Sequence, residues 1–299
     1  DLVSVWKMYW LLRKLKPDII HSMTPKAGLV SMIAGFFAGV PCRIHTFSGL
    51  VFPARKGIMR RLLIFTDRLI CLFATHLIPE GDGVKKDLQK VGITRKPLEV
   101  VGYGSAVGLD TMYYSRDNAL KVGMPDIREK LMYNSSDVVL LYVGRLVKDK
   151  GLVELVNAFA RLHAKHPEAK LMLVGPFEPH TDPLPDQVTD TLMSHKAIAI
   201  VGHQDDVRPY YMAADIFVLP SYREGFPNVV LEACSMDLPC IVTDINGSNE
   251  IIVPHVNGLV VPAGTSDPLY EAMEQMVCDK HMRTKFGSRS RELVAEKFG

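Results

Sequence analysis

The strongest constraint on the fold is a regular alternation of short apolar runs with segments of helical periodicity. Runs rich in Val, Ile and Leu occupy residues 138–144, 170–175, 197–202, 215–221 and 239–244. After the first run, apolar residues recur at 152, 155, 156, 159 and 162, the spacing of one helix face. Fully apolar runs fit strands that are buried on both faces of a parallel sheet. The pattern therefore predicts an α/β architecture.

The first part of the chain has the same alternation. It predicts strands at residues 17–22, 41–48, 75–81 and 98–104, and helices at 6–15, 26–39 and 57–74. Residues 112–137 are polar and irregular, and we expect the connection between two domains there. A length of 299 residues also indicates about two domains. We predict Rossmann-like domains at 1–118 and 119–299 that face a cleft.

Composition excludes several classes of function. A net charge of +2 argues against a general nucleic-acid-binding protein, which needs a concentrated basic surface. The five cysteines are scattered and form no C-x-x-C pair, so we expect reduced thiols in a cytoplasmic protein, without a zinc site or disulfides. No apolar run reaches the roughly 20 residues that span a bilayer. The chain opens in a helical pattern without an initiator Met, so we expect a piece of a longer protein whose first domain is incomplete.

Cations follow the first strand of the predicted second domain. The strand ends in "GRLVKDKG", which places Arg145 and Lys150 beside Gly144. Ligands of parallel sheets bind past the carboxyl ends of the strands, and two cations there suit a phosphate group. The alternative is a solvated turn before a helix, with Asp149 as a local ionic partner. The residues alone leave both interpretations open.

Two carboxylates flank the start of a second predicted helix. In "SYREGFPNVVLEAC", seven residues separate Glu224 from Glu232. Pro227 suits a first helical turn, and the free N–H groups of that turn can bind a diphosphate, with Asn228 beside them. Carboxylates are good acceptors for sugar hydroxyls, so a nucleotide sugar explains both features. The alternative assigns Glu224 to the helix dipole and Glu232 to a solvated helix face.

These motifs resemble glycosyltransferase family 4, the retaining enzymes of the GT-B fold. The resemblance extends through "PCIVTDINGSNEII" and "NGLVVPAGTSDPL", and "PDIIHSMTPKAGL" in the first half is similar to the branch that builds bacterial capsules, O-antigens and lipid-linked glycans. It implies transfer of a hexose or N-acetylhexosamine from a nucleotide-diphosphate sugar, with UDP favoured. The acceptor would be a glycan or a polyprenyl-diphosphate-linked sugar, in surface polysaccharide biosynthesis.

The resemblance also implies roles for individual residues. Arg145 and Lys150 would hold the donor diphosphate and stabilise the leaving group, which is electrostatic catalysis. Glu224 would meet hydroxyls of the donor sugar, and Glu232 would accept the ribose hydroxyls. The family acts without a metal or a cofactor. The remaining expected donor contacts are Gly144, Gly225, Phe226, Pro227, Asn228 and Val229.

Candidate acceptor-side residues lie in the first half. Lys26 follows a strand end, and Ser48 stands where many relatives carry a His in a "T-x-H-G" context, with His45 three residues earlier. The family's first strand with its glycine-rich loop is missing from the sequence, and its last helix is absent or cut.

A basic segment raises the question of a membrane partner. "RKGIMRRLLIF" sets Arg55, Lys56, Arg60 and Arg61 beside an apolar run, which suits peripheral contact with the cytoplasmic face of the inner membrane. A solvated helix face next to core is an equal alternative.

Two other classes of protein are compatible with the expected fold. UDP-N-acetylglucosamine 2-epimerases bind a sugar nucleotide between similar domains, and a non-catalytic sugar-nucleotide-binding subunit would keep the site without the chemistry.

Overall fold

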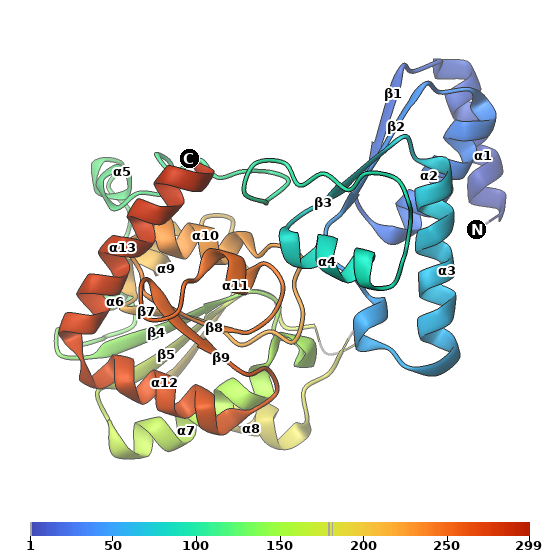
Figure 1. The fold of residues 1–299 in the computed structure, drawn as a ribbon. Coiled ribbons are helices and arrows are strands. Elements are labelled where there is room, and N and C mark those ends of the chain that lie inside the picture. The colour runs from blue at the N-terminus through green and yellow to red at the C-terminus, as the bar shows by residue number, and fades with distance from the viewer. Residues whose placement is uncertain (1, 179, 181) are drawn as a thin grey trace. The chain divides into compact units, whose positions relative to one another are not determined.

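The chain forms two compact α/β units in a computed structural model that describes residues 2–178, 180 and 182–299 (Figure 1). The first unit comprises residues 2–107 together with Glu224–Phe226. The second comprises Gly108–Arg223 and Pro227–Gly299. Each unit is built on a parallel sheet, which confirms the predicted fold class.

The sheet of the first unit has three parallel strands in the order β1-β2-β3. They are β1 (Ile19–Ser22), β2 (Cys42–Phe47) and β3 (His76–Pro79). Its helices are α1 (Leu2–Leu15), α2 (Pro25–Ala38), the 3₁₀ turn η1 (Phe52–Ala54), α3 (Gly57–Phe73) and α4 (Asp82–Lys90).

Glycines let α2 lie close to the strands of the first unit. A Cβ atom at Gly28 would lie 2.5 Å from Cε1 of His45, and one at Gly35 would lie 2.3 Å from Cδ1 of Ile20. The two glycines are seven residues apart and therefore share a helix face. The backbone of α2 itself thus forms one wall around His45.

The strand predicted at residues 98–104 is wrong. The segment donates one backbone hydrogen bond to β3, from Glu99 N–H to the Leu77 carbonyl (3.3 Å). Gly102 and Gly104 then adopt φ angles of 58° and 103°, which turn the backbone away from extended geometry. The apolar residues of this segment favour a strand, but the two glycines that interrupt them favour turns.

The second unit has a six-stranded parallel sheet in the order β6-β5-β4-β7-β8-β9. The strands are β4 (Val138–Val143), β5 (Ala169–Val174), β6 (Ile198–Gly202), β7 (Ile216–Leu219), β8 (Cys240–Thr243) and β9 (Gly258–Val261). β4 and β7 are buried along their whole length, as the apolar runs predicted. β9 was not predicted as a strand; it has four residues, like β7 and β8, and it joins the sheet by pairing with β8.

Helices cover both faces of this sheet. Figure 1 shows α7, α8 and α12 on one face and α9 and α10 on the other, where α13 packs against α10. The helices and 3₁₀ turn are α5 (Arg116–Lys121), α6 (Ile127–Lys130), η2 (Lys148–Lys150), α7 (Leu152–Lys165), α8 (Asp186–Ser194), α9 (Arg208–Ala213), α10 (Asn228–Ser235), α11 (Ser248–Ile251), α12 (Ser266–Cys278) and α13 (Lys280–Phe298).

The polar segment 112–137 is more ordered than its sequence indicated, because it contains α5 and α6. Arg128 donates to the Ala213 carbonyl (2.9 Å) and pairs with Asp215 (2.5 Å). Arg116 donates to the Met236 carbonyl (2.9 Å). These contacts attach the segment to the second unit.

One glycine allows the loop after β4 to pack on the loop after β7. Gly151 has φ 73°, and a Cβ atom there would lie 2.0 Å from the carbonyl oxygen of Pro220. That distance is far below van der Waals contact, so only glycine fits this position without moving backbone. Gly264 has the same φ of 73°, but a Cβ atom there would meet nothing within 4 Å.

We predict that Gly151→Ala destabilises the protein much more than Gly264→Ala. Both substitutions carry the cost of roughly 1–2 kcal/mol for an L-residue in left-handed geometry. Only Gly151→Ala also displaces the Pro220 backbone. Urea unfolding of the two variants measures the difference, and equal losses of unfolding free energy would contradict the packing argument.

Candidate functional site

The strand order of the second unit has its reversal point between β4 and β7. The chain runs from β4 outward through β5 and β6, and returns to β7 on the other side of β4 before continuing to β8 and β9. Open α/β sheets bind ligands at the carboxyl ends of strands at such a reversal. The loops that leave these two ends are residues 144–151 and 220–227. Predicted donor residues far apart in the sequence therefore come together at one sheet edge.

Hydrogen bonds join the two loops directly. The Tyr222 N–H donates to the Asp149 carbonyl (2.9 Å), and the Arg223 guanidinium pairs with the Asp149 carboxylate (3.0 Å). The Tyr222 hydroxyl donates to Glu154 on α7 (2.8 Å). Asp149 therefore holds the loop after β7, and it also interacts electrostatically with Arg145, as the alternative interpretation assumed.

Arg145 follows Gly144, the first residue after β4. Gly144 has φ 154°, and a Cβ atom there would lie 2.7 Å from the Tyr142 hydroxyl, which donates to the Arg145 carbonyl (2.8 Å). The Arg145 side chain is 41% exposed and pairs with Glu178 at 3.0 Å. That hydrogen bond raises the pKa of Arg145 further. A half-exposed pair of this kind contributes at most about 1 kcal/mol, so a ligand phosphate can compete for the guanidinium.

Glu232 lies in α10 and is hydrogen-bonded to two tyrosines, of which Tyr211 is fully buried. The Tyr211 hydroxyl donates to its carboxylate at 2.9 Å, and the Tyr114 hydroxyl also bonds to it. Burial raises the pKa of Glu232, while these two hydrogen bonds act to lower it. Glu232 is thus not the solvated helix residue of the alternative interpretation. Tyr114 and Tyr211 were missed because they are distant in sequence and belong to no local motif.

The start of α10 faces the same sheet edge. Pro227 is the N-cap, one position earlier than the first helical turn expected from the sequence, and Asn228 begins the helix. Asn228 and Val229 are half-buried. The helix N-terminus supplies a positive dipole end beside the loop after β4. Glu224, Gly225 and Phe226 group with the first unit.

Two of the three acceptor-side candidates line one small pocket of the first unit. His45 and Ser48 border it, together with Asp67 of α3, which the sequence analysis did not single out. Lys26 lies in the first turn of α2 and is not among the lining residues. The Ser48 hydroxyl donates to the Met23 carbonyl (2.9 Å).

His45 is a buried, neutral imidazole. Its Nδ1 is 2.8 Å from the Ser22 hydroxyl, and its ring meets Phe47 edge to face. Burial, helped by the neighbouring His21, lowers the pKa of His45 to about 4. The ring therefore stays uncharged at neutral pH.

Asp67 is the opposite case, a carboxyl group whose burial favours its neutral form. It is 7% exposed, and burial raises its pKa to about 7. Since an isolated buried carboxylate is costly, the group takes up a proton well above the usual range of aspartate.

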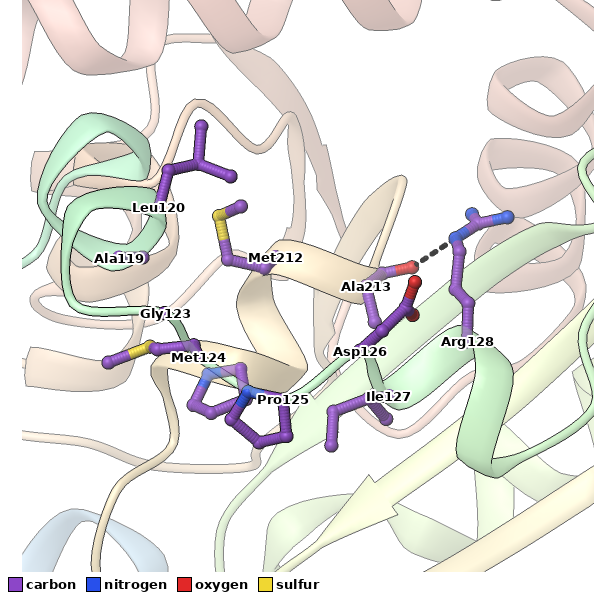
Figure 2. Close-up of a pocket in the computed structure, with 11 residues that line it drawn as sticks. Ala119, Leu120, Gly123, Met124, Pro125, Asp126, Ile127, Arg128, Met212 and Ala213 are labelled. Atoms are coloured by element: carbon purple, nitrogen blue, oxygen red, sulfur yellow. Dashed lines mark hydrogen bonds between the residues drawn. The ribbon is translucent and has the colours of Figure 1, made fainter.

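A larger pocket of the second unit is lined by none of the predicted donor residues. It has a volume of about 330 Å³ and is lined by residues of α5, α6, α9 and the segment between α5 and α6, including Leu120, Met124, Ile127 and Met212 (Figure 2). Ala213 precedes β7, and Arg128 precedes β4. The pocket is therefore near the amino ends of these strands, opposite the edge where parallel sheets bind ligands.

Within residues 2–178, 180 and 182–299, His, Cys, Asp and Glu side chains form no group of three that could hold a metal ion. In the same described residues, no helix combines the length and hydropathy that crossing a membrane requires.

Comparison with known proteins decides the family. Residues 123–293 match the family described as "Glycosyl transferases group 1", and residues 1–104 match "Glycosyltransferase Family 4". The chain belongs to the group 1 glycosyl transferases. It is 31% identical to the capsular polysaccharide biosynthesis glycosyltransferase CapM of Staphylococcus aureus, over 100% of this chain and 77% of that protein. This result confirms the predicted glycosyltransferase activity.

A second relative and a solved structure complete the comparison. The chain is 30% identical to the UDP-Gal:alpha-D-GlcNAc-diphosphoundecaprenol alpha-1,3-galactosyltransferase of Escherichia coli, over 94% of this chain and 71% of that protein. Anabaena HepE in complex with UDP-glucose superimposes with a TM-score of 0.83 at 20% identity, covering 98% of this chain and 78% of that chain. The structural likeness confirms the GT-B fold predicted for this glycosyltransferase.

We predict that Asp67→Asn becomes more stable relative to the native chain as pH rises. Unfolded Asp67 loses its proton near pH 3.8 and the folded group near pH 7, so the unfolded state binds fewer protons between these values and the native chain loses stability there. Asn cannot ionise. The difference in unfolding free energy should shift toward the variant by up to about 1.4 kcal/mol per pH unit in this window. Urea titrations at pH 4 to 8 measure it. A difference that does not change with pH would contradict the assignment.

Proposed function

We propose that this glycosyltransferase moves a hexose or N-acetylhexosamine from a UDP-sugar to a glycan or polyprenyl-diphosphate-linked acceptor, with retention of configuration. One observation supports the donor half of this proposal. The same sheet edge of the second unit holds Arg145, Lys150, the start of α10 and Glu232. Cations and a helix N-terminus suit a diphosphate, and a carboxylate one to two turns further along α10 suits ribose hydroxyls.

The charge of each residue indicates its role in this reaction. As the bond from the sugar to the diphosphate breaks, negative charge develops on the leaving UDP. Arg145, Lys150 and the α10 N-terminus stabilise that charge. Glu224 holds hydroxyls of the donor sugar. The leaving phosphate accepts the proton of the acceptor hydroxyl, so the mechanism needs neither an enzymic nucleophile nor a metal.

The names of the relatives support the acceptor class. The Escherichia coli relative is named for a diphosphoundecaprenol acceptor, and CapM of Staphylococcus aureus is named for capsular polysaccharide biosynthesis. We infer an acceptor that is bound by the first unit and a reaction in the cytoplasm. The relatives named above are transferases, which favours this proposal over an epimerase or a non-catalytic subunit.

We predict that the chain binds UDP in the micromolar range and GDP more weakly. Glu232→Ala should weaken UDP binding at least tenfold, because hydrogen bonds to a charged group contribute about 1.5–3 kcal/mol. Isothermal titration calorimetry of the native chain and the variant measures both effects.

Two controls separate ligand contact from damage to the fold. Glu232→Gln keeps a partner for the buried Tyr211 hydroxyl, so it tests the carboxylate charge alone. Glu271→Ala changes an exposed glutamate of α12 and should leave the affinity unchanged. UDP binding that survives Glu232→Ala in full would contradict the donor assignment. A free epimer formed from UDP-N-acetylglucosamine without acceptor would favour the epimerase.

We also propose that the first unit touches an anionic membrane surface through the start of α3. Ile58 is 86% exposed there, and Met59, Leu62 and Phe65 are also exposed. The same segment carries the basic residues Arg55, Lys56, Arg60 and Arg61, which alternate in sequence with these apolar residues. Apolar side chains flanked by cations are typical of surfaces that lie at the headgroup level.

We predict that replacing the exposed Arg55, Lys56 and Arg61 together by Ala weakens sedimentation with phosphatidylglycerol vesicles at least tenfold. Each basic residue near an anionic surface contributes about 1 kcal/mol. Arg60 is kept because it lies over the Phe52 ring. The matched control replaces the exposed Lys280, Lys285 and Arg289 of α13 by Ala. Equal binding by both triple variants would contradict the proposal.

A further inference from the structure

Asp67 is a buried carboxyl group without a hydrogen-bonding partner. It is 7% exposed, and no other described residue forms a hydrogen bond or ion pair with it. Lys96 donates to the Cys71, Leu72 and Ala74 carbonyls at the end of α3. An unpartnered buried carboxyl costs free energy that a purely structural position would avoid by using an apolar side chain.

Asp67 borders a small pocket of the first unit. The lining includes Asp67, His45 and Ser48, with apolar walls from Phe47 and Leu63. The volume is about 10 Å³, which admits one group of the size of a water molecule. A phosphate or a sugar ring does not fit such a space, whereas a single hydroxyl does.

The polar groups of the lining complement a hydroxyl. Nδ1 of His45 is engaged by Ser22, and Nε2 of the ring has no hydrogen-bond partner among the described residues. The Ser48 hydroxyl uses its proton on the Met23 carbonyl and keeps its oxygen lone pairs as acceptors. A carboxyl group can accept a hydrogen bond or, when protonated, donate one. A hydroxyl both donates and accepts, so it satisfies this lining where an apolar group would not.

Access to the pocket is from the carboxyl end of β2. Ser48 and Pro25, which also line it, are exposed, while Asp67 and His45 are buried. A group that enters between the exposed residues therefore meets the carboxyl at the inner end. Gly28 of α2 packs against the His45 ring, since a Cβ atom there would lie 2.5 Å from Cε1.

We propose that this pocket is the subsite for one hydroxyl of the acceptor sugar, with Asp67 as its hydrogen-bonding residue. The inference rests on the proposed function, in which the first unit binds a glycan acceptor. Asp67 is a binding residue in this account, and His45 and Ser48 are its neighbours in the same subsite.

The test is a set of binding measurements with a defined probe. The probe is N-acetylglucosamine joined through an α-diphosphate to a short alkyl chain, together with its 3-, 4- and 6-deoxy analogues. Calorimetry in the presence of UDP gives the affinity of the native chain, Asp67→Ala and Asp67→Asn for each. Asp67→Ala should weaken probe binding about tenfold, and Asp67→Asn, which keeps the size and hydrogen bonding of the side chain, should stay within about threefold of the native chain.

The deoxy analogues identify the contact. For one hydroxyl position, the losses from removing the hydroxyl and from Asp67→Ala should not add, because each removes the same interaction. Losses that add at every position, or an Asp67→Ala affinity equal to that of the native chain, would overturn the proposal. Cys71→Ala, a buried change one turn further along α3 and outside the pocket, should not alter probe binding. An equal loss in Cys71→Ala and Asp67→Ala would assign the effect to α3 packing and would also overturn it.

UDP binding separates this inference from the proposed function. A native chain that binds UDP but not the probe would overturn the hydroxyl subsite and leave the donor half of the function intact. A chain that binds the probe with the expected pattern but does not bind UDP would contradict the donor assignment alone.

Discussion

The donor edge of the second unit depends on one close contact between backbones. The Pro220 carbonyl occupies the space that a side chain at position 151 would need, so the loops after β4 and β7 can meet only because residue 151 is glycine. Asp149 then fixes the arrangement by bonding to both Tyr222 and Arg223. The strand order places these loops at the reversal point of the sheet, and the candidate diphosphate-binding groups follow from that placement.

Each unit contains a carboxyl group whose pKa is raised by burial. In the second unit, Glu232 is partly buried but receives two tyrosine hydroxyls, which hold it as a hydrogen-bond acceptor. In the first unit, Asp67 is buried without such donors, and its pKa rises to about 7. The first is suited to accept hydrogen bonds from ribose hydroxyls. The second can accept a hydrogen bond when charged and donate one when protonated.

Much of the fold was predictable because it rests on local patterns. The apolar runs of β4 and β7 and the spaced apolar face of α7 follow directly from burial on a parallel sheet. The sequence-based predictions fail at other elements. Residues 98–104 are apolar enough for a strand but are turned by Gly102 and Gly104, and β9 joins the sheet only through its pairing with β8. The donor residues were named from their motifs. Tyr211 and Asp67 lie outside any motif, and only the folded chain brings them beside Glu232 and His45.

The central claim is that UDP binds at the carboxyl edge of the six-stranded sheet in the second unit. Hydrogen–deuterium exchange of the chain with and without UDP tests it most directly, because it reports protection of individual backbone segments. The account predicts slower exchange in residues 144–151 and at the start of α10. Protection confined to α5, α6 and α9, which line the other pocket of this unit, or no change in residues 144–151, would contradict it.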